Sequence, residues 1–241
     1  MHPALRERNH RPWPVPNGPW MLEQRWRNLL FLHWEVSISS IRERIPKSLE
    51  IDTFDGSAWI AIVPFEMTGV GPRGMPKPKG ISDFPEINVR TYVRHGGKPG
   101  VWFFSLDVPH RLPVWLARAF FHLPYFRATM QVSSTSSGQT RYQSTRPDRV
   151  FDGGYGPSSP FEARADSFER WATERYCFYA ASRNGNLFRA EVQHPPWPLH
   201  IGEFEIERNT MLAPFEIGGQ HPSVLFAQDL PVVAWLPRRC D

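Results

Sequence analysis

Cysteine is scarce in this chain of 241 residues, which has only Cys177 and Cys240. Such a pair cannot form the disulfide framework that stabilises small secreted domains. Long apolar runs and a secretory leader pattern are also missing. A stretch such as Ala58 to Val63 is far shorter than the roughly 20 residues that a membrane-spanning helix needs. We therefore expect a reduced, cytoplasmic protein with no membrane partner.

Lysine is rare as well, and most of the positive charge comes from arginine. The formal net charge is +4, but the basic residues are scattered singly and form no run or stripe. This distribution argues against a nucleic-acid partner. The lysines lie in a Gly/Pro loop, in a turn or after a helix-ending proline, and none lies in a predicted buried strand; they are Lys47, Lys77, Lys79 and Lys98. Amine chemistry needs a protected lysine, so the sequence argues against it.

Motifs for metals, cofactors and activated nucleophiles are absent. His194 and His200 are separated by three prolines and a tryptophan, and no zinc-like spacing of His, Cys and acids occurs elsewhere. No Gly-x-Ser-x-Gly elbow is present, and the Gly69–Ser82 loop lacks the ending of a phosphate loop. Cys177 alternates with aromatic residues, which indicates an inert core position. We predict neither metal nor cofactor.

Aromatic residues and turn formers are abundant. The chain has 10 Trp and 17 Phe beside 25 Pro and 17 Gly, and it is 41% hydrophobic. This composition predicts a mainly β protein with a few short helices and a sizeable core. Residues 1–20 read as a proline-rich extension, and residues 21–241 as one domain. The extension either docks through Trp13 and Trp20 or stays loose, and a solvated tail is favoured.

One strand-like run, Phe84 to Arg94, has an unusual polar row. Glu86, Asn88, Arg90 and Tyr92 alternate with Ile87, Val89 and Val93, so the polar side chains share one face of a strand. An exposed strand with a solvated face is one interpretation. The other is a strand whose polar face lines a cavity. There Arg90 would bind a carboxylate or phosphate and Glu86 would serve as an acid or base, or the two would only form an internal ion pair.

Further patterns predict the remaining elements. Leu29 to Val36 reads as a buried strand carrying His33, for which a hydrogen-bonded core role competes with a functional one. The loop from Gly69 to Ser82 resembles a lid or pocket wall, with Arg73 as its most interesting residue.

Helices are expected from a Ser39 or Ser40 cap to Pro46, over Pro113 to His122, and from Asp166 through Trp171. Hairpins are expected across Asp55-Gly56, His95-Gly96-Gly97, Ser133 to Gln139 and Asn184-Gly185-Asn186, with a last strand at Pro231 to Trp235.

A set of ordered sequence blocks resembles the uncharacterised DUF2071 (YqjF-like) family over roughly Arg25 to Trp235. The blocks are Phe31-Leu32-His33-Trp34, Phe54-Asp55-Gly56-Ser57-Ala58-Trp59, Val63-Pro64-Phe65, Pro72-Arg73-Gly74, Glu86 to Val93, Phe103 to Asp107, Leu123-Pro124-Tyr125, Thr173 to Tyr176 and Pro196-Trp197-Pro198-Leu199. That family is grouped by fold with acetoacetate decarboxylase. The resemblance implies an antiparallel barrel or double cone that encloses a hydrophobic pocket.

The same resemblance bears on individual site residues. Glu86 matches a pocket glutamate of acetoacetate decarboxylase, while Tyr125 and Phe126 stand where that enzyme has its pair of lysines. The Schiff-base amine is therefore missing, and we predict that the protein is not an acetoacetate decarboxylase. The Tyr125 phenol either donates a hydrogen bond to a carbonyl or fills the vacated space.

Two function classes follow. The first is a small-molecule-binding protein for a carboxylate- or carbonyl-bearing metabolite, with Glu86 and Tyr125 central and with Asn88, Arg90, Tyr92, Arg73 and His33 as ligand-binding candidates. The alternative is an enzyme, of lyase or isomerase type, that uses Glu86 for acid/base chemistry on such a compound. An interaction scaffold with exposed tryptophans is a third possibility, and it predicts no cavity.

Overall fold

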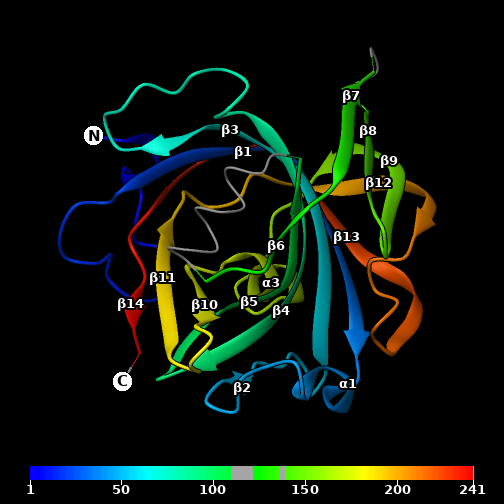
Figure 1. Ribbon diagram of the computed structural model, residues 1–241, viewed down its shortest axis with the longest axis horizontal. Coiled ribbons are helices and arrows are strands. Elements are labelled where there is room, and N and C mark those ends of the chain that lie inside the picture. The colour runs from blue at the N-terminus through cyan, green and yellow to red at the C-terminus, as the bar shows by residue number, and fades with distance from the viewer. Residues whose placement is uncertain (110–121, 136–138, 241) are drawn as a thin grey trace.

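Long strands dominate the computed structural model, which describes residues 1–109, 122–135 and 139–240 (Figure 1). In chain order the elements are η1 (Pro3–Leu5), β1 (Leu22–Val36), α1 (Ile38–Arg42), β2 (Glu50–Ile51), β3 (Ala58–Pro72), β4 (Phe84–His95), β5 (Lys98–Val108), β6 (Tyr125–Arg127), β7 (Thr129–Ser134), β8 (Thr140–Arg146), β9 (Arg149–Pro160), α3 (Phe168–Thr173), β10 (Cys177–Ala181), β11 (Leu187–Gln193), β12 (Leu199–Asn209), β13 (Ile217–Ala234) and β14 (Arg238–Arg239). No helix among these is long and apolar enough to cross a bilayer.

The strands form one sheet that closes on itself. Its order is β14-β11-β10-β5-β4-β3-β1-β13-β12-β9-β8-β7, and a further pairing of β11 with β13 joins the run from β11 to β13 into a ring. Figure 1 looks into this ring, and β7, β8, β9 and β12 extend the sheet to one side. The mainly β barrel is thus confirmed. Two of its pairings, β5 with β6 and β5 with β10, are parallel, so the sheet is mixed rather than purely antiparallel.

The two faces of the ring bury different apolar sets, because successive strand residues point to opposite sides. The inner face holds Phe31, Val63, Phe65 and Leu106. The outer face holds a second cluster, which includes Leu32, Ile62 and Val89 together with residues of α1, β8 and β9. Both faces of the central strands are therefore covered, as their near-continuous apolar runs predict.

A β-bulge in β5 changes which residues of that strand face inward. Val89 lies opposite Ser105, whereas Arg90 lies opposite Phe103, so β5 has one extra residue at this point. As a result Phe103 and Leu106 both pack in the inner cluster. Close approach of β5 to β10 also requires Gly100, because a Cβ there would lie 2.7 Å from the Cys177 sulfur.

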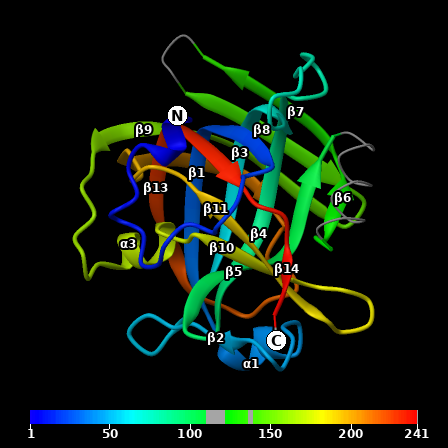
Figure 2. The same ribbon diagram turned by 90° about the vertical axis from the view of Figure 1, so that its left-hand side faces the viewer.

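The short helix α3 lies at one end of the ring and β6 lies toward the other (Figure 2). The side chain of Ser167 caps α3 by accepting a hydrogen bond from the backbone N–H of Arg170. Its Phe168 and Trp171 rings pack against Trp59 and Tyr92, with ring centroids 4.1 and 4.6 Å apart. Aromatic contacts hold this helix, which is too short to be stable alone.

The first 20 residues are docked on the ring, so the favoured expectation of a solvated tail is wrong. Arg11 is 7% exposed, and its guanidinium donates to the carbonyl oxygen of Val192 and to the carboxylate of Glu191, both at 2.5 Å. The indole of Trp13 donates to the same carboxylate at 2.9 Å. One buried arginine thus donates to acceptors on β11. The contact of Trp13 agrees with the alternative expectation, in which the extension docks through its tryptophans.

Most predicted turns form where the sequence places them. β4 and β5 pair across Gly96 and Gly97, which both have positive φ, and the hairpins β7–β8 and β10–β11 also form. The Asp55-Gly56 turn forms too, but β2 pairs with β4 and not with β3. The first arm of the expected hairpin, β2, therefore pairs with a strand that is more distant in the sequence, β4.

Other boundaries differ from the sequence-based expectations. α1 is capped by Ser37, two or three residues earlier than the expected Ser39 or Ser40. Strands β9 and β12 were not predicted, because their Gly-rich and charged sequences lack apolar alternation. β3 continues to Pro72, into the predicted loop. The expected helix from Pro113 to His122 lies almost wholly outside the described residues.

Candidate functional site

The polar row of β4 lies on the inner face of the ring. β4 is a central strand between β3 and β5, and Ile87 and Val89 pack in the outer cluster, so Glu86 and Arg90 point the other way. Glu86 is only 2% exposed. The interpretation of this stretch as an exposed strand with a solvated face is therefore wrong.

Glu86 is held by Tyr125, whose hydroxyl donates to the Glu86 Oε2 atom at 2.9 Å. Burial raises the pKa of Glu86 to about 7, and the hydrogen bonds from Tyr125 and Asn88 only partly oppose this. The nearby Asp107 charge adds to the rise. Burial keeps the pKa of Tyr125 well above its ordinary value, so its phenol remains a neutral donor. A carboxyl that titrates near neutrality suits proton transfer.

The two residues that stand in place of lysines in the resemblance lie on opposite faces of β6. Tyr125 packs in the inner cluster beside Glu86, whereas Phe126 lines a cavity outside the ring. β6 pairs in parallel with β5, with Tyr125 opposite Leu106, which fixes this orientation. Only the first of the two positions can therefore act together with Glu86.

Arg90 has no acidic partner among the described residues, although its side chain points into the ring. The ion pairs of the described residues do not include it, and its Nε atom is buried without a hydrogen-bond partner. Its guanidinium lies over the rings of Phe31 and Tyr92, at 5.2 and 5.9 Å. The internal Glu86–Arg90 ion pair, one of the alternatives, is thus wrong for the structure. Residues 110–121, which lie outside the described part, contain no Asp or Glu in the sequence.

Arg90 is not completely enclosed by its neighbours. Its side chain is partly accessible, although it extends from the middle of a central strand toward the inner face. Phe178 and Trp26, which also pack toward the interior, are partly accessible as well. Accessible surface on inward-pointing side chains requires room for solvent or a ligand between them.

His33 lies on β1, two strands away from Arg90 and separated from it by Ala61 of β3. Its Nε2 atom is 2.6 Å from the Tyr92 hydroxyl, and its Nδ1 atom is buried without a partner. Burial lowers the pKa of His33 well below its ordinary value, and the charges of Arg90 and Arg175 act in the same direction. The imidazole is therefore neutral. Its Nε2 atom is held by Tyr92, and its Nδ1 atom is left to form one hydrogen bond with a ligand.

A buried ion pair supports this end of the interior. Arg175 donates to Asp52 at 2.5 Å, and its guanidinium lies 4.8 Å from the centre of the Tyr92 ring. Nothing local in the sequence points to Asp52 as the partner of Arg175. The two residues are 123 positions apart, so only the folded chain brings them together.

Arg73 is not part of this group. It is exposed in the β3–β4 connection, where its guanidinium lies 4.8 Å from the centre of the Trp20 ring. The structure therefore brings together Glu86, Asn88, Tyr125, Arg90, Tyr92 and His33, and leaves Arg73 elsewhere. Within the described ranges, no group of His, Cys and acids could hold a metal ion.

Glu86 should make stability depend on pH in a defined window. Its folded pKa of about 7 lies above its ordinary value of 4.5, so in this window the folded protein binds a proton that the unfolded chain has lost. The resulting stabilisation is fully present below pH 4.5 and is lost as the pH rises through about 7. Glu86→Gln should remove this dependence, changing the difference in unfolding free energy between variant and wild type by roughly 3 kcal/mol across the window.

Urea denaturation of both proteins at several pH values measures this difference. Burial also raises the pKa of Asp107, to about 6. Asp107 is present in both proteins, so its contribution cancels in the difference between their unfolding free energies. The exposed Glu203 provides a matched Glu→Gln control. Parallel stability curves for wild type and Glu86→Gln would show that Glu86 titrates normally.

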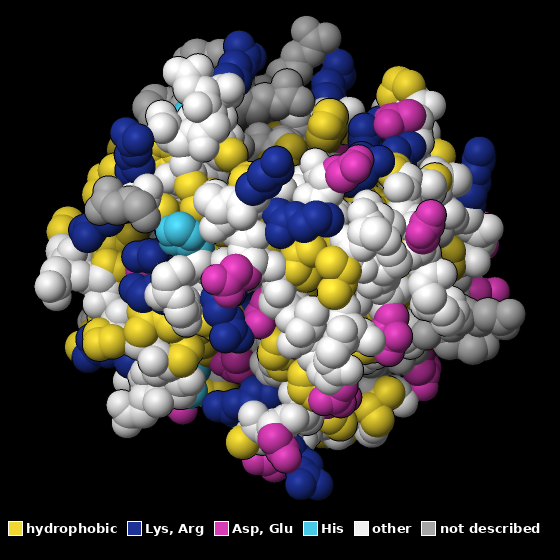
Figure 3. All heavy atoms as spheres, turned by 90° about the horizontal axis from the view of Figure 1, so that it is seen from below, with side chains coloured by type: hydrophobic (Ala, Val, Ile, Leu, Met, Phe, Trp, Pro, Cys, Tyr) yellow, Lys and Arg dark blue, Asp and Glu magenta, His cyan; other side chains and the backbone are white. Residues whose placement is uncertain are grey.

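Comparison with known proteins identifies the relatives of this chain. Residues 23–231 match the DUF2071 family, described as an uncharacterized conserved protein. The chain is also 45% identical over 201 residues to the uncharacterized protein YqjF of Bacillus subtilis, with 82% of each protein covered. The chain belongs to the DUF2071 family. Figure 3 shows acidic and basic side chains interspersed on the lower face of this family member, without a stripe of one sign.

Solved structures with the same fold are distant in sequence. The enduracididine biosynthesis enzyme MppR, complexed with the condensation product of pyruvate and imidazole 4-carboxaldehyde, has a TM-score of 0.65 at 10% identity, over 93% of this chain and 90% of that one. Acetoacetate decarboxylase from Legionella pneumophila has a TM-score of 0.62 at 13% identity, over 97% and 94%. This DUF2071 chain therefore has an acetoacetate decarboxylase-like fold.

Proposed function

We propose that this protein binds a small oxo acid, a metabolite with a carboxylate and a carbonyl group, inside the ring. Arg90 forms an ion pair with the carboxylate. The carbonyl oxygen accepts a hydrogen bond from the Tyr125–Glu86 pair. The observation that carries the proposal is that Arg90, on the inner face of the ring, is partly accessible and has no acidic partner among the described residues. A partly buried cation without a counter-ion is unfavourable, and a bound carboxylate offsets that cost.

The spacing along β4 favours a short ligand. Glu86 and Arg90 lie four residues apart on one strand face, which corresponds to about 13 Å between their Cα atoms. Much of that span is filled by the Arg90 side chain and by the Glu86–Tyr125 pair. The remaining gap suits an unbranched acid of a few carbon atoms. One solved relative in fold, MppR, is complexed with pyruvate, which is an acid of this kind.

The positions of the lysines support binding without a Schiff base. Lys47 and Lys79 are exposed, Lys77 pairs with Glu23, and Lys98 approaches Glu191 and the ring of Trp13 on the outside. No lysine accompanies Glu86 on the inner face. A covalent adduct of the decarboxylase type therefore has no amine to form on.

An enzyme is the second candidate, favoured by the pKa of Glu86 near 7. In that case Glu86 takes a proton from the carbon next to the ligand carbonyl and returns it to another position, while the Tyr125 phenol stabilises the enolate oxygen. This is an isomerase-type proton transfer. Exchange of ligand C–H protons with deuterated water, catalysed by wild type and absent in Glu86→Gln, distinguishes the enzyme from a binding protein.

Calorimetric titration with short oxo acids, from pyruvate to 4-oxopentanoate, tests the proposed binding. At least one acid should bind saturably, with a dissociation constant below about 10 mM, and its amide should bind at least about tenfold more weakly. Borohydride added to the complex should leave the protein mass unchanged. The proposal is overturned if no acid binds, if acid and amide bind equally, or if borohydride traps an adduct on a lysine.

A further inference from the structure

A cavity lies outside the ring, on the outer side of β5. It has a volume of about 780 Å³ and is bounded by β5, the start of β6, the β8–β9 turn, the segment after α1 and residues 211–215. This volume is in the range of small-molecule sites. The side chains of the polar row of β4 do not contribute to it, so it is separate from the proposed oxo-acid site.

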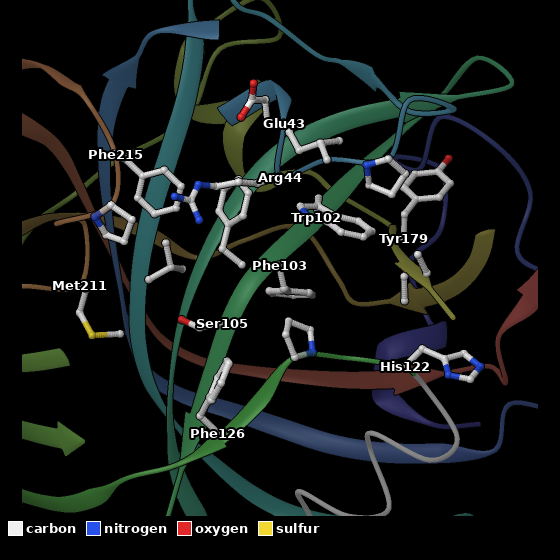
Figure 4. Close-up of a pocket in the computed structure, with 18 of the residues that line it drawn as sticks. Glu43, Arg44, Trp102, Phe103, Ser105, His122, Phe126, Tyr179, Met211 and Phe215 are labelled. Carbon is white, nitrogen blue, oxygen red and sulfur yellow. The ribbon is translucent and has the colours of Figure 1, made fainter. Parts of the chain in front are cut away.

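Aromatic rings form much of the cavity wall. Trp102 and Phe104 come from β5, Phe126 from β6 and Phe215 from the segment before β13, and all four are partly accessible. Figure 4 shows Trp102, Phe126 and Phe215 around the same hollow. The outer apolar cluster continues beneath them, since Trp102, Phe104 and Phe215 pack against it. Such walls favour a flat apolar group, which stacks on ring faces or edges.

Basic side chains outnumber acidic ones around the same cavity. The lining includes Arg44, Lys47, Arg146 and Arg149 against Glu43 and Asp148. Arg146 and Arg149 already pair with acids. Arg44 and Lys47 are exposed at the rim and form no ion pair within the part of the chain that the structure describes. Arg44 is positioned over the Phe215 ring, 5.4 Å from its centre, so its charge lies beside the aromatic wall.

We propose that this outer cavity binds a flat aromatic compound with an anionic group. The ring of the ligand lies between Trp102, Phe126 and Phe215, and its carboxylate or sulfonate is paired with Arg44 and Lys47 at the rim. The aromatic wall favours the ring of the ligand, and the cations beside it favour the anionic group. The inference does not depend on the proposed oxo-acid function, because Glu86, Arg90 and Tyr125 do not line this cavity.

Titration with 1-naphthylacetate and its neutral amide, 1-naphthylacetamide, tests this site. The acid should bind wild type at least about tenfold more tightly than the amide does, because only the acid pairs with the rim. Arg44→Glu/Lys47→Glu should abolish this preference. Lys79→Glu/Arg164→Glu changes the same charges at exposed positions away from the cavity and should retain it.

An obstructing variant tests the location independently of charge. Ala181 lines the cavity from β10, and Ala181→Trp should weaken binding of both acid and amide by at least about tenfold. Thermal unfolding of each variant checks that the fold persists. If Ala181→Trp is unfolded, the result for Arg44→Glu/Lys47→Glu alone tests the inference. The inference is overturned if wild type binds neither compound, if acid and amide bind equally, or if the rim variant retains the preference. It is also overturned if Arg90→Met abolishes binding of the acid, which would place the acid inside the ring.

Discussion

Arg90→Met should abolish the preference of the inner site for an oxo acid over its amide. The substitution removes a guanidinium that points into accessible space beside Phe31 and Tyr92. A hydrogen bond to a charged group contributes about 1.5–3 kcal/mol, so the affinity for the acid should fall about ten- to hundredfold. Affinity for the amide should change little. Calorimetric titration of both ligands into wild type and variant measures this result.

Two further variants show whether the charge or the shape of Arg90 matters. Arg90→Lys keeps the positive charge and loses the planar fork, so its affinity for the acid should lie between those of wild type and Arg90→Met. Arg164→Met, at an exposed position, should bind the acid as wild type does. If Arg90→Met binds the acid as tightly as wild type, the carboxylate is not held by Arg90, and the proposed orientation of the ligand is wrong.

Asp52→Ala should cause the largest loss of stability. Asp52 accepts from Arg175 at 2.5 Å and from Arg94 at 2.8 Å, and the side chains of Asp52 and Arg175 are each 4% exposed. Removal of Asp52 leaves the Arg175 guanidinium buried without its counter-ion. Breaking a buried ion pair in this way costs about 3–5 kcal/mol of unfolding free energy. Urea denaturation at neutral pH measures the loss.

A surface ion pair provides the control for this prediction. Glu207 accepts from Arg141 at 2.7 Å, but its side chain is 58% exposed. Glu207→Ala should therefore change stability little, because water replaces the lost partner. Equal effects of the two substitutions would show that Arg175 is reached by water or finds another acceptor. Arg175 would then not hold Tyr92 and His33 in place.

Local patterns were sufficient for much of the barrel and for the position of the polar row. The alternation of Glu86, Asn88 and Arg90 with apolar neighbours determines that they share one face of β4, because strand geometry depends on adjacent residues alone. The turn at Gly96-Gly97 is local in the same sense, since positive φ values favour glycine there. The family blocks correctly indicated the fold, and the mixed pairing of β5 was the main departure from it.

Contacts between distant segments decided the rest. The pKa of Glu86 rises because the ring excludes water around it, and its partner Tyr125 is 39 residues away. Arg175 meets Asp52 over 123 residues, and Arg11 meets β11 over about 180. Burial and ion pairing depend on which segments meet in space, and alternation within a strand does not report this. The sequence by itself therefore determined that Glu86 and Arg90 share a face. The tertiary structure decided that this face is enclosed, that the two do not pair, and that Arg90 lacks an acidic partner in the part of the chain that the structure describes.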